Sequence, residues 1–199
     1  MGLRKLLGRN YYSISRRKLL YFHFIIPNRD AIRKKRLLGF YKKAVYNQKT
    51  ITTGMGTVSI GKRCAFGFKP GGYYYSGLIE LQPRYENAKI VIGNQVNTNN
   101  NLFICAANSV EIGDFTLIGE GVCIMDHEAH GIEPDKRRCL GKISSVKIGE
   151  NVWIGNRVTI LKNTEIGDNS IIAAGAVVSG QFSNNVIIGG IPARIIKHI

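Results

Sequence analysis

The stretch VKIGENVWIGNRVTILKNTEIGDNSIIAAGAVVSG, residues 146–180, places an aliphatic side chain at every sixth position. A second series of small or β-branched residues recurs four positions after each aliphatic one. Neither the 3.6-residue period of an α-helix nor the two-residue period of a flat strand matches this spacing. The aliphatic series is Ile148, Ile154, Ile160, Ile166, Ile172 and Val178, and the smaller series is Val152, Val158, Thr164, Ser170 and Ala176.

A period of six predicts short strands separated by tight turns, wound into a parallel β-helix whose stacked coils bury the aliphatic positions. The same pattern occurs earlier with interruptions, at Ile60, Ile92, Ile112, Ile118 and Ile124. We therefore predict an all-β fold in which the β-helix domain spans residues 51–185 and a C-terminal tail follows at 186–199.

The register of the repeat breaks over residues 125–147, within the part of the chain assigned to the β-helix. This excursion contains His127 and His130, two of the four histidines of the chain. A long insertion in a repeat array costs little closure entropy and commonly carries function on one face. The sequence therefore places the candidate functional site at this excursion loop.

Basic residues are concentrated before the repeats. The 199-residue chain has a formal net charge of +15, and half of its 28 Lys and Arg residues lie in residues 1–50. Within this N-terminal segment, residues 28–46 read as a basic amphipathic helix. Such a helix can cap the first coil of the β-helix, or bind an anionic membrane surface, and both functions are compatible with the pattern.

Cysteine spacing and hydropathy favour a cytoplasmic protein. Cys64, Cys105, Cys123 and Cys139 form no CxxC pair, so neither a zinc knuckle nor a disulfide framework is indicated. The longest apolar run, residues 19–26, is too short to span a bilayer and lacks the cleavage site of a signal peptide. We expect a cytoplasmic location with peripheral contact at the inner membrane face.

Three segments resemble the bacterial hexapeptide-repeat acyltransferases, in the branch of the maltose, galactoside and nodulation-factor O-acetyltransferases. They are VEIGDFTLIGEGVCIMDHEAHGI (110–132), the stretch 146–180 and the terminal IIGGIPARIIKHI (187–199). The resemblance implies a left-handed parallel β-helix, a homotrimer and acetyl-CoA as co-substrate. It further implies transfer of acetyl to a saccharide hydroxyl, which suits a surface polysaccharide or its precursor.

The resemblance also implies roles for individual residues. His130 falls at the position of the family's catalytic base, and imidazole titrates near neutral pH, as a general base requires. Asn99 and Asn101 fall near the asparagine that binds the acceptor sugar, and His127 is a further candidate for substrate binding. Where relatives often carry an acidic sugar contact, this chain has Ala106 and Ala107, which argues against a maltose-like acceptor.

Further positions are candidates for binding acetyl-CoA. Trp153 lies at an outward position, where it lines either the cofactor cleft or the trimer interface. The C-terminal cations suit the phosphates of coenzyme A, and a guanidinium matches phosphate better than an ammonium group does. The predicted cofactor contacts are Trp153, Gly155, Ala173, Ala174, Arg194 and Lys197.

Two other classes of function remain as alternatives, and a third is disfavoured. An N-acetyltransferase acting on an amino-sugar nucleotide would use the same fold with an amine as nucleophile. A non-catalytic protein that binds membrane surfaces would use the basic residues 1–50. A zinc hydratase would need a third histidine on the coils, and the chain lacks one there, so we predict no metal site. No sequence motif of a nucleic-acid-binding protein is present.

Overall fold

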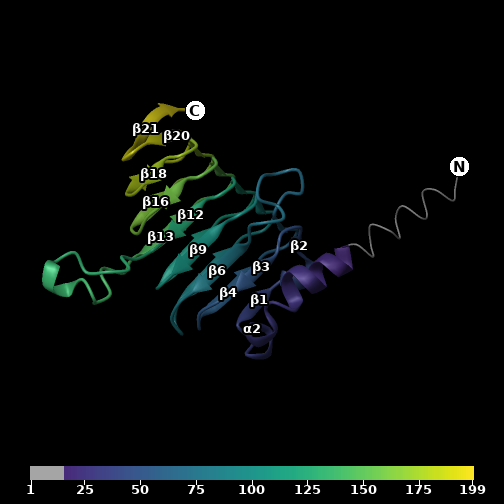
Figure 1. Cartoon of the computed structure of the whole chain (residues 1–199). Coiled ribbons are helices and arrows are strands. Elements are labelled where there is room, and N and C mark those ends of the chain that lie inside the picture. Colours follow the sequence, from purple (N-terminus) through teal and green to yellow (C-terminus); the bar gives the residue numbers. More distant parts are fainter. Residues whose placement is uncertain (1–15) are drawn as a thin grey trace, which may run out of the picture.

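The computed structural model describes residues 16–199, and it shows a parallel β-helix whose coils stack along one axis (Figure 1). Three parallel sheets form its sides, and the chain visits them in the order A, B, C in each coil. Sheet A contains β1 (Leu37–Gly39), β4 (Thr57–Ile60), β7 (Lys89–Ile92), β10 (Ser109–Ile112), β13 (Ser145–Ile148), β16 (Thr164–Ile166) and β19 (Gln181–Phe182).

The other two sheets are built in the same way from one strand of each coil. Sheet B contains β2 (Val45–Tyr46), β5 (Ala65–Phe66), β8 (Asn97–Thr98), β11 (Leu117–Ile118), β14 (Trp153–Ile154), β17 (Ile171–Ile172), β20 (Val186–Gly190) and β21 (Ala193–His198). Sheet C contains β3 (Thr50–Thr52), β6 (Ile79–Pro83), β9 (Phe103–Ala106), β12 (Cys123–Met125), β15 (Thr159–Ile160) and β18 (Val177–Val178).

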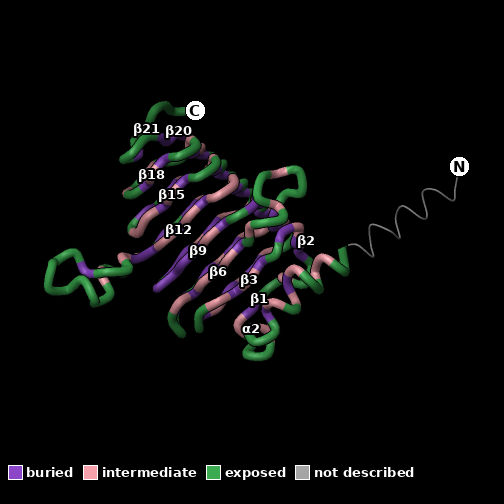
Figure 2. The backbone as a smooth tube through the Cα atoms, viewed as in Figure 1, coloured by how far each residue is buried: buried purple, intermediate pink, exposed green. Residues whose placement is uncertain are grey.

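The six-residue period arises because equivalent residues of successive coils stack directly on one another. In sheet B, Ile118 pairs with Ile154, which pairs with Ile172. In sheet C, Ile124 pairs with Ile160. Both predicted series, the aliphatic one and the smaller one, are buried throughout residues 148–178 (Figure 2). The interior of the solenoid is thus a set of apolar columns, as the repeat predicted.

The predicted helix over residues 28–46 is wrong. Only α2 (Arg29–Arg33) and the short 3-10 helix η2 (Tyr41–Lys43) are helical there, and Leu37 in β1 already pairs with Val58 in β4. The apolar residues that match a helical period alternate between the interior and the surface of a first, irregular coil. Sheet A begins at residue 37, so the boundary predicted at 51 is corrected.

The C-terminal boundary at 185 is corrected as well. Strand β20 continues sheet B through a parallel pairing of Ile188 with Ile172, and β21 then turns back to pair antiparallel with β20. The segment predicted as a tail is therefore the last part of sheet B.

A helical segment covers the first coil. It consists of a helical turn at residues 16–20, the π-helix η1 (Tyr21–Ile25) and α2. Phe24 is fully buried, and its ring stacks on that of Tyr46 at 4.0 Å between centroids. Tyr46 in turn stacks on Phe66 at 5.2 Å. This segment caps the first coil, whereas the sequence assigned the capping function to a helix at residues 28–46.

Among residues 16–199, no helix is long and apolar enough to cross a membrane.

Candidate active site

A cavity of about 400 Å³ lies over the outer face of sheet B. Its floor is formed by outward side chains of successive strands, because Asn97 pairs with Leu117 and Leu117 pairs with Trp153. Its lining includes four asparagines and three exposed large apolar residues, namely Asn47, Asn97, Asn99, Asn156, Phe68, Leu117 and Trp153. Amides that can donate and accept hydrogen bonds, beside an exposed indole, form a surface suited to a polar ring.

The loop of residues 67–78 forms one wall of this cavity, and two buried amide side chains hold the loop in place. The Asn100 side chain accepts a hydrogen bond from the Phe68 N–H and donates to the Phe68 and Gly72 carbonyls, all at 2.8–2.9 Å. The Gln48 side chain donates to the Tyr73 carbonyl at 2.8 Å. The loop wall is therefore fixed by side-chain hydrogen bonds rather than by a sheet.

The structure brings two of the predicted site residues together in this cavity and separates a third from it. Asn99 and Trp153 both line the cavity. Asn101 instead occupies a corner of the coil with φ of 61°, and its N–H donates to the Gln48 side chain at 2.7 Å. The backbone geometry alone explains an asparagine at position 101, since this residue type tolerates left-handed conformations.

The predicted cofactor residues Gly155 and Ala173 belong to a column of small residues at the corner between sheets B and C. A Cβ atom on Gly155 would lie 2.6 Å from the backbone nitrogen of Ala174. Further along, a Cβ atom on Gly189 would lie 3.1 Å from the Ala173 Cβ. Close stacking of the coils therefore requires glycine at position 155, and the side chain of Ala174 is exposed beside it.

Arg194 and Lys197 lie on β21, at the last edge of the sheet that carries Trp153. Both residues are exposed. The Arg194 guanidinium donates one hydrogen bond to the carbonyl of Ala193 at 2.7 Å. Two cations thus stand at the C-terminal end of sheet B, on the side of the cavity where the small-residue column continues.

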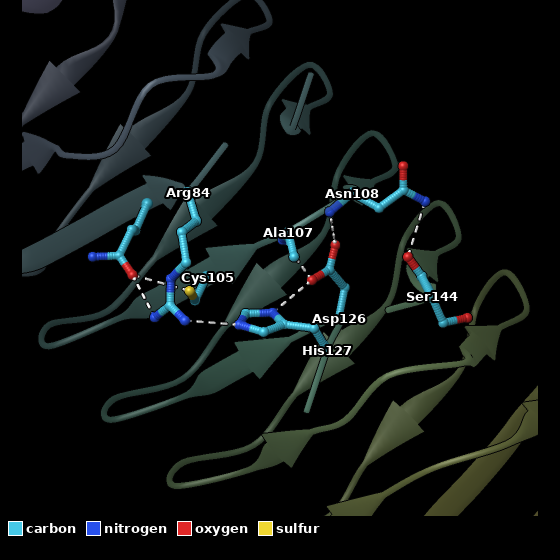
Figure 3. Close-up of polar contacts among 8 residues, drawn as sticks. Arg84, Cys105, Ala107, Asn108, Asp126, His127 and Ser144 are labelled. Atoms are coloured by element: carbon cyan, nitrogen blue, oxygen red, sulfur yellow. Dashed lines mark hydrogen bonds and ion pairs between the residues drawn. The ribbon is translucent and has the colours of Figure 1, made fainter. Parts of the chain in front are cut away.

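The predicted excursion leaves sheet C after Met125 and enters sheet A at Ser145 (Figure 1). The loop contains one helical turn, η3 (Pro134–Lys136). At its start the buried Asp126 carboxylate accepts hydrogen bonds from the N–H groups of Ala107 and Asn108, at 2.7 and 2.8 Å. The Asn108 side chain donates to the Ser144 carbonyl at 2.9 Å, so the start and the end of the excursion are fastened together (Figure 3).

His127 is buried in a polar cluster at the same place (Figure 3). Its Nδ1 lies 2.9 Å from Oδ1 of Asp126, and its Nε2 lies 3.0 Å from Nη1 of Arg84. A second nitrogen of Arg84 donates to the Gln82 side chain at 3.0 Å. Because a guanidinium can only donate, the imidazole nitrogen that faces Arg84 accepts. Both ring nitrogens of His127 are therefore occupied within the chain.

His130 has the opposite character. Its side chain is exposed, and its Nδ1 lies 2.8 Å from the carbonyl oxygen of Arg137. A carbonyl only accepts, so Nδ1 carries the proton and Nε2 keeps its lone pair directed away from this bond. This is the tautomer that a general base needs. Of the two predicted histidines, His130 has the nitrogen available for proton transfer.

Electrostatics also stabilise the excursion at Glu128. Its carboxylate accepts a hydrogen bond from the Lys142 N–H at 3.0 Å and forms an ion pair with Lys162 at 3.2 Å. The Lys142 hydrogen bond and then the Lys162 charge lower the pKa of this carboxyl below its ordinary value.

The cavity and His130 lie on different parts of one chain. The excursion leaves at the corner between sheets C and A, which in a three-sided solenoid is opposite sheet B. Figure 1 shows the excursion and the loop of residues 67–78 projecting from opposite sides of the coils. The sequence missed Asn47, Asn97 and Asn156, although Asn97 and Asn99 are spaced to point the same way. Within residues 16–199, no three His, Cys, Asp or Glu side chains are grouped as metal ligands.

Comparison with known proteins agrees with this architecture. Residues 145–180 match the bacterial transferase hexapeptide family, described as six repeats. The candidate lipopolysaccharide biosynthesis O-acetyl transferase WbbJ of Escherichia coli is 38% identical over 139 residues, which cover 64% of this chain and 69% of that protein. The galactoside O-acetyltransferase of the same species is 38% identical over 114 residues, covering 56% of this chain and 55% of the relative.

Solved structures share the fold. A galactoside acetyltransferase in complex with coenzyme A has a TM-score of 0.51 at 24% identity and covers 86% of this chain and 70% of its own. AntD, an N-acyltransferase from Bacillus cereus solved as a variant with dTDP and coenzyme A, has a TM-score of 0.63 at 18% identity, covering 85% and 87%. These similarities concern the fold.

The coils, their six-residue period and these matches define the chain as a left-handed β-helix acyltransferase. It belongs to the hexapeptide-repeat transferase family, and its homologues within that family include sugar O-acetyltransferases.

Proposed function

We propose that the protein transfers an acetyl group from acetyl-CoA to a hydroxyl of a saccharide, in a surface polysaccharide or its precursor. The observation that carries this proposal is the cavity in which Asn99 and Trp153 meet, on a chain that also presents a histidine with an available Nε2. An amide can recognise a hydroxyl, and an indole face can pack on a sugar ring. The names of the relatives WbbJ and galactoside O-acetyltransferase support the same class of acceptor.

The donor fits the C-terminal half of sheet B. Trp153 is exposed on this half of the sheet, and the small residues Gly155, Ala173 and the exposed Ala174 follow it at the corner, where they leave room for a cofactor to approach the backbone. Arg194 and Lys197 stand at the end of this sheet, where they can bind the phosphates of coenzyme A. The acetyl thioester would then lie near Trp153, at the end of the cavity opposite Asn47 and Asn97.

The chemistry is a direct transfer in which one proton is moved twice. His130 removes the proton of the acceptor hydroxyl while its oxygen attacks the thioester carbonyl carbon. The tetrahedral intermediate collapses, the carbon–sulfur bond breaks, and the proton passes from the imidazole to the thiolate of coenzyme A. The products are the acetylated saccharide and free coenzyme A, and no covalent enzyme intermediate is needed.

The base comes from a neighbouring copy in this proposal. Since the excursion lies at the corner opposite sheet B, His130 of one chain reaches the cavity of another chain in a homotrimer. His127 then acts on the substrate only indirectly, because both of its ring nitrogens are bonded within its own chain.

The N-terminal segment is proposed to bring the enzyme to the inner face of an anionic membrane from the cytoplasm. Arg16, Arg17 and Lys18 precede Tyr21 and Phe22, which are 53% and 60% exposed. Cations beside exposed aromatic rings suit a lipid headgroup region. The predicted contact through residues 1–50 also includes residues 1–15, which lie outside the described residues. Co-sedimentation of the protein with anionic vesicles but not with neutral ones would support this location. Failure to sediment with either kind of vesicle would contradict it.

The test of the transferase is release of free thiol from acetyl-CoA in the presence of a panel of methyl glycosides, free amino sugars and nucleotide sugars. Turnover with a hydroxyl acceptor supports the proposal. Turnover only with an amine would replace it by the N-acetyltransferase alternative, and thiol release with no member of a broad panel would contradict a saccharide acceptor.

A further inference from the structure

A second cavity, of about 660 Å³, adjoins the first one at its N-terminal end. The two share Asn47 and Ala65 in their linings, so they lie side by side over the first coils of sheet B. The helical segment, described from residue 16 onward, forms one side of the second cavity, and the loop of residues 67–78 contributes to the other. It lies on the side of the candidate acceptor cavity that points away from Trp153.

The lining of this second cavity is basic and aromatic. Arg16, Lys18 and Lys69 supply cations, and Phe22 and Tyr74 supply rings. Among residues 16–199, no acidic residue lines the cavity, and no ion pair involves these three cations. Unpaired cations around a concave surface attract phosphate groups strongly, because charge-assisted bonds to phosphate are stronger than neutral ones.

We infer that the acceptor is a saccharide attached to a diphosphate, with its sugar in the first cavity and its diphosphate in the second. This inference rests on the proposed function and specifies its substrate class. The adjacency of the two cavities at Asn47 and Ala65 suits such an acceptor, because the phosphate of an activated sugar is bonded directly to the ring. The group beyond the diphosphate, either a nucleoside or a lipid, lies against Phe22 and Tyr74.

The test compares three acceptors that carry the same hexose: a methyl glycoside, a uridine diphosphate hexose and a farnesyl diphosphate hexose. We expect kcat/KM for at least one diphosphate to exceed that of the methyl glycoside by about tenfold or more. Lys69→Ala should remove most of this advantage by raising KM for the diphosphate, with little change for the methyl glycoside. The farnesyl and uridine arms distinguish a lipid-linked from a nucleotide-linked acceptor.

Lys147→Ala is the matched control, because it removes one exposed cation from the outer face of sheet A, where Lys147 pairs with Glu165 at 3.6 Å. It should leave the preference unchanged. Equal kcat/KM for all three acceptors would overturn the inference while leaving the proposed function in place, and so would a preference that Lys69→Ala does not reduce. If no acceptor is acetylated, the proposed function fails. Calorimetry with uridine diphosphate hexose then tests separately whether the second cavity binds a diphosphate. Binding that Lys69→Ala weakens supports the inference, and the absence of binding overturns it.

Discussion

Nδ1 of His127 lies 2.9 Å from Oδ1 of Asp126, and both side chains are almost completely buried where the excursion begins. Asp126 also holds two backbone N–H groups, and His127 reaches Arg84 on the other side. The excursion is therefore anchored to the coils by a hydrogen-bonded cluster. His130 projects only three residues beyond this anchor.

Replacing the anchor should cost stability. In His127→Ala, the buried Asp126 and the half-buried Arg84 each lose a hydrogen bond, which costs about 1–3 kcal/mol in the free energy of unfolding. Denaturant unfolding of the variant at a fixed protein concentration measures this loss. The exposed His198→Ala is the matched control and should unfold with the native protein. An unaltered denaturation midpoint for His127→Ala would show that the cluster makes no net contribution to the free energy of unfolding.

Replacing the proposed base should cost turnover and not stability. Since only the imidazole Nε2 of His130 is free to accept a proton, His130→Ala should lower kcat by about a hundredfold or more. Thiol release measures the rate, and His198→Ala again controls for loss of a surface histidine. Native turnover in His130→Ala would exclude this residue as the base.

The separation of the cavity from His130 predicts complementation between subunits. His130→Ala and Asn99→Ala should each be nearly inactive alone. After the two variants are unfolded and refolded together, sites that combine an intact Asn99 with an intact His130 from a neighbour should restore about a quarter of the native rate by random assortment in a trimer. Refolding each variant alone is the control. No recovery in the mixture would place both groups of each site on one chain.

The Glu128 carboxylate should make the stability of the excursion depend on acidity. The Lys142 N–H and the Lys162 charge place the pKa of this carboxyl below its ordinary value of 4.5. A group with a lowered folded-state pKa stabilises fully above its unfolded-state pKa, and this contribution is lost as the pH falls through the folded-state value. At pH 7 the native protein should therefore have a higher melting temperature than Glu128→Gln, and this difference should disappear as the pH is lowered.

Glu133→Gln serves as the control for that comparison, because Glu133 lies in the same excursion and forms none of the ion pairs found within residues 16–199. Its melting temperature should follow that of the native protein across the pH range. A gap for Glu128→Gln that stays constant from pH 7 into acid would contradict the assigned cause.

The regularly repeating part of the fold could be predicted because its inward-facing residues occupy equivalent positions in the coils. Ile154 and Ile160 are six residues apart and occupy adjacent sheets of one coil, so their spacing carries the geometry. The first coil could not be predicted in this way. Leu37 and Tyr46 are nine residues apart, and the apolar residues between them also fit a helix.

Individual residues of the candidate site could be proposed from the sequence only where they lie within a recognisable motif. Asn99 and Trp153 could be assigned from motifs, and the structure places both in one cavity. The bond of His127 to Arg84 joins residues 43 positions apart, on strands whose pairing the sequence does not reveal. The cations Arg16 and Lys69 line one cavity only because the helical segment packs against the first coil.

The aromatic stack of Phe24 on Tyr46 and the returning strand β21 have a shared consequence for self-association. A parallel solenoid exposes unpaired strand edges and an apolar lumen at both ends, and either end can template another chain into a growing fibre. Here the helical segment blocks the lumen at one end, and β21 covers the edge of β20 at the other. Elongation along the solenoid axis is thereby discouraged, and contacts between copies are left to the sides of the solenoid.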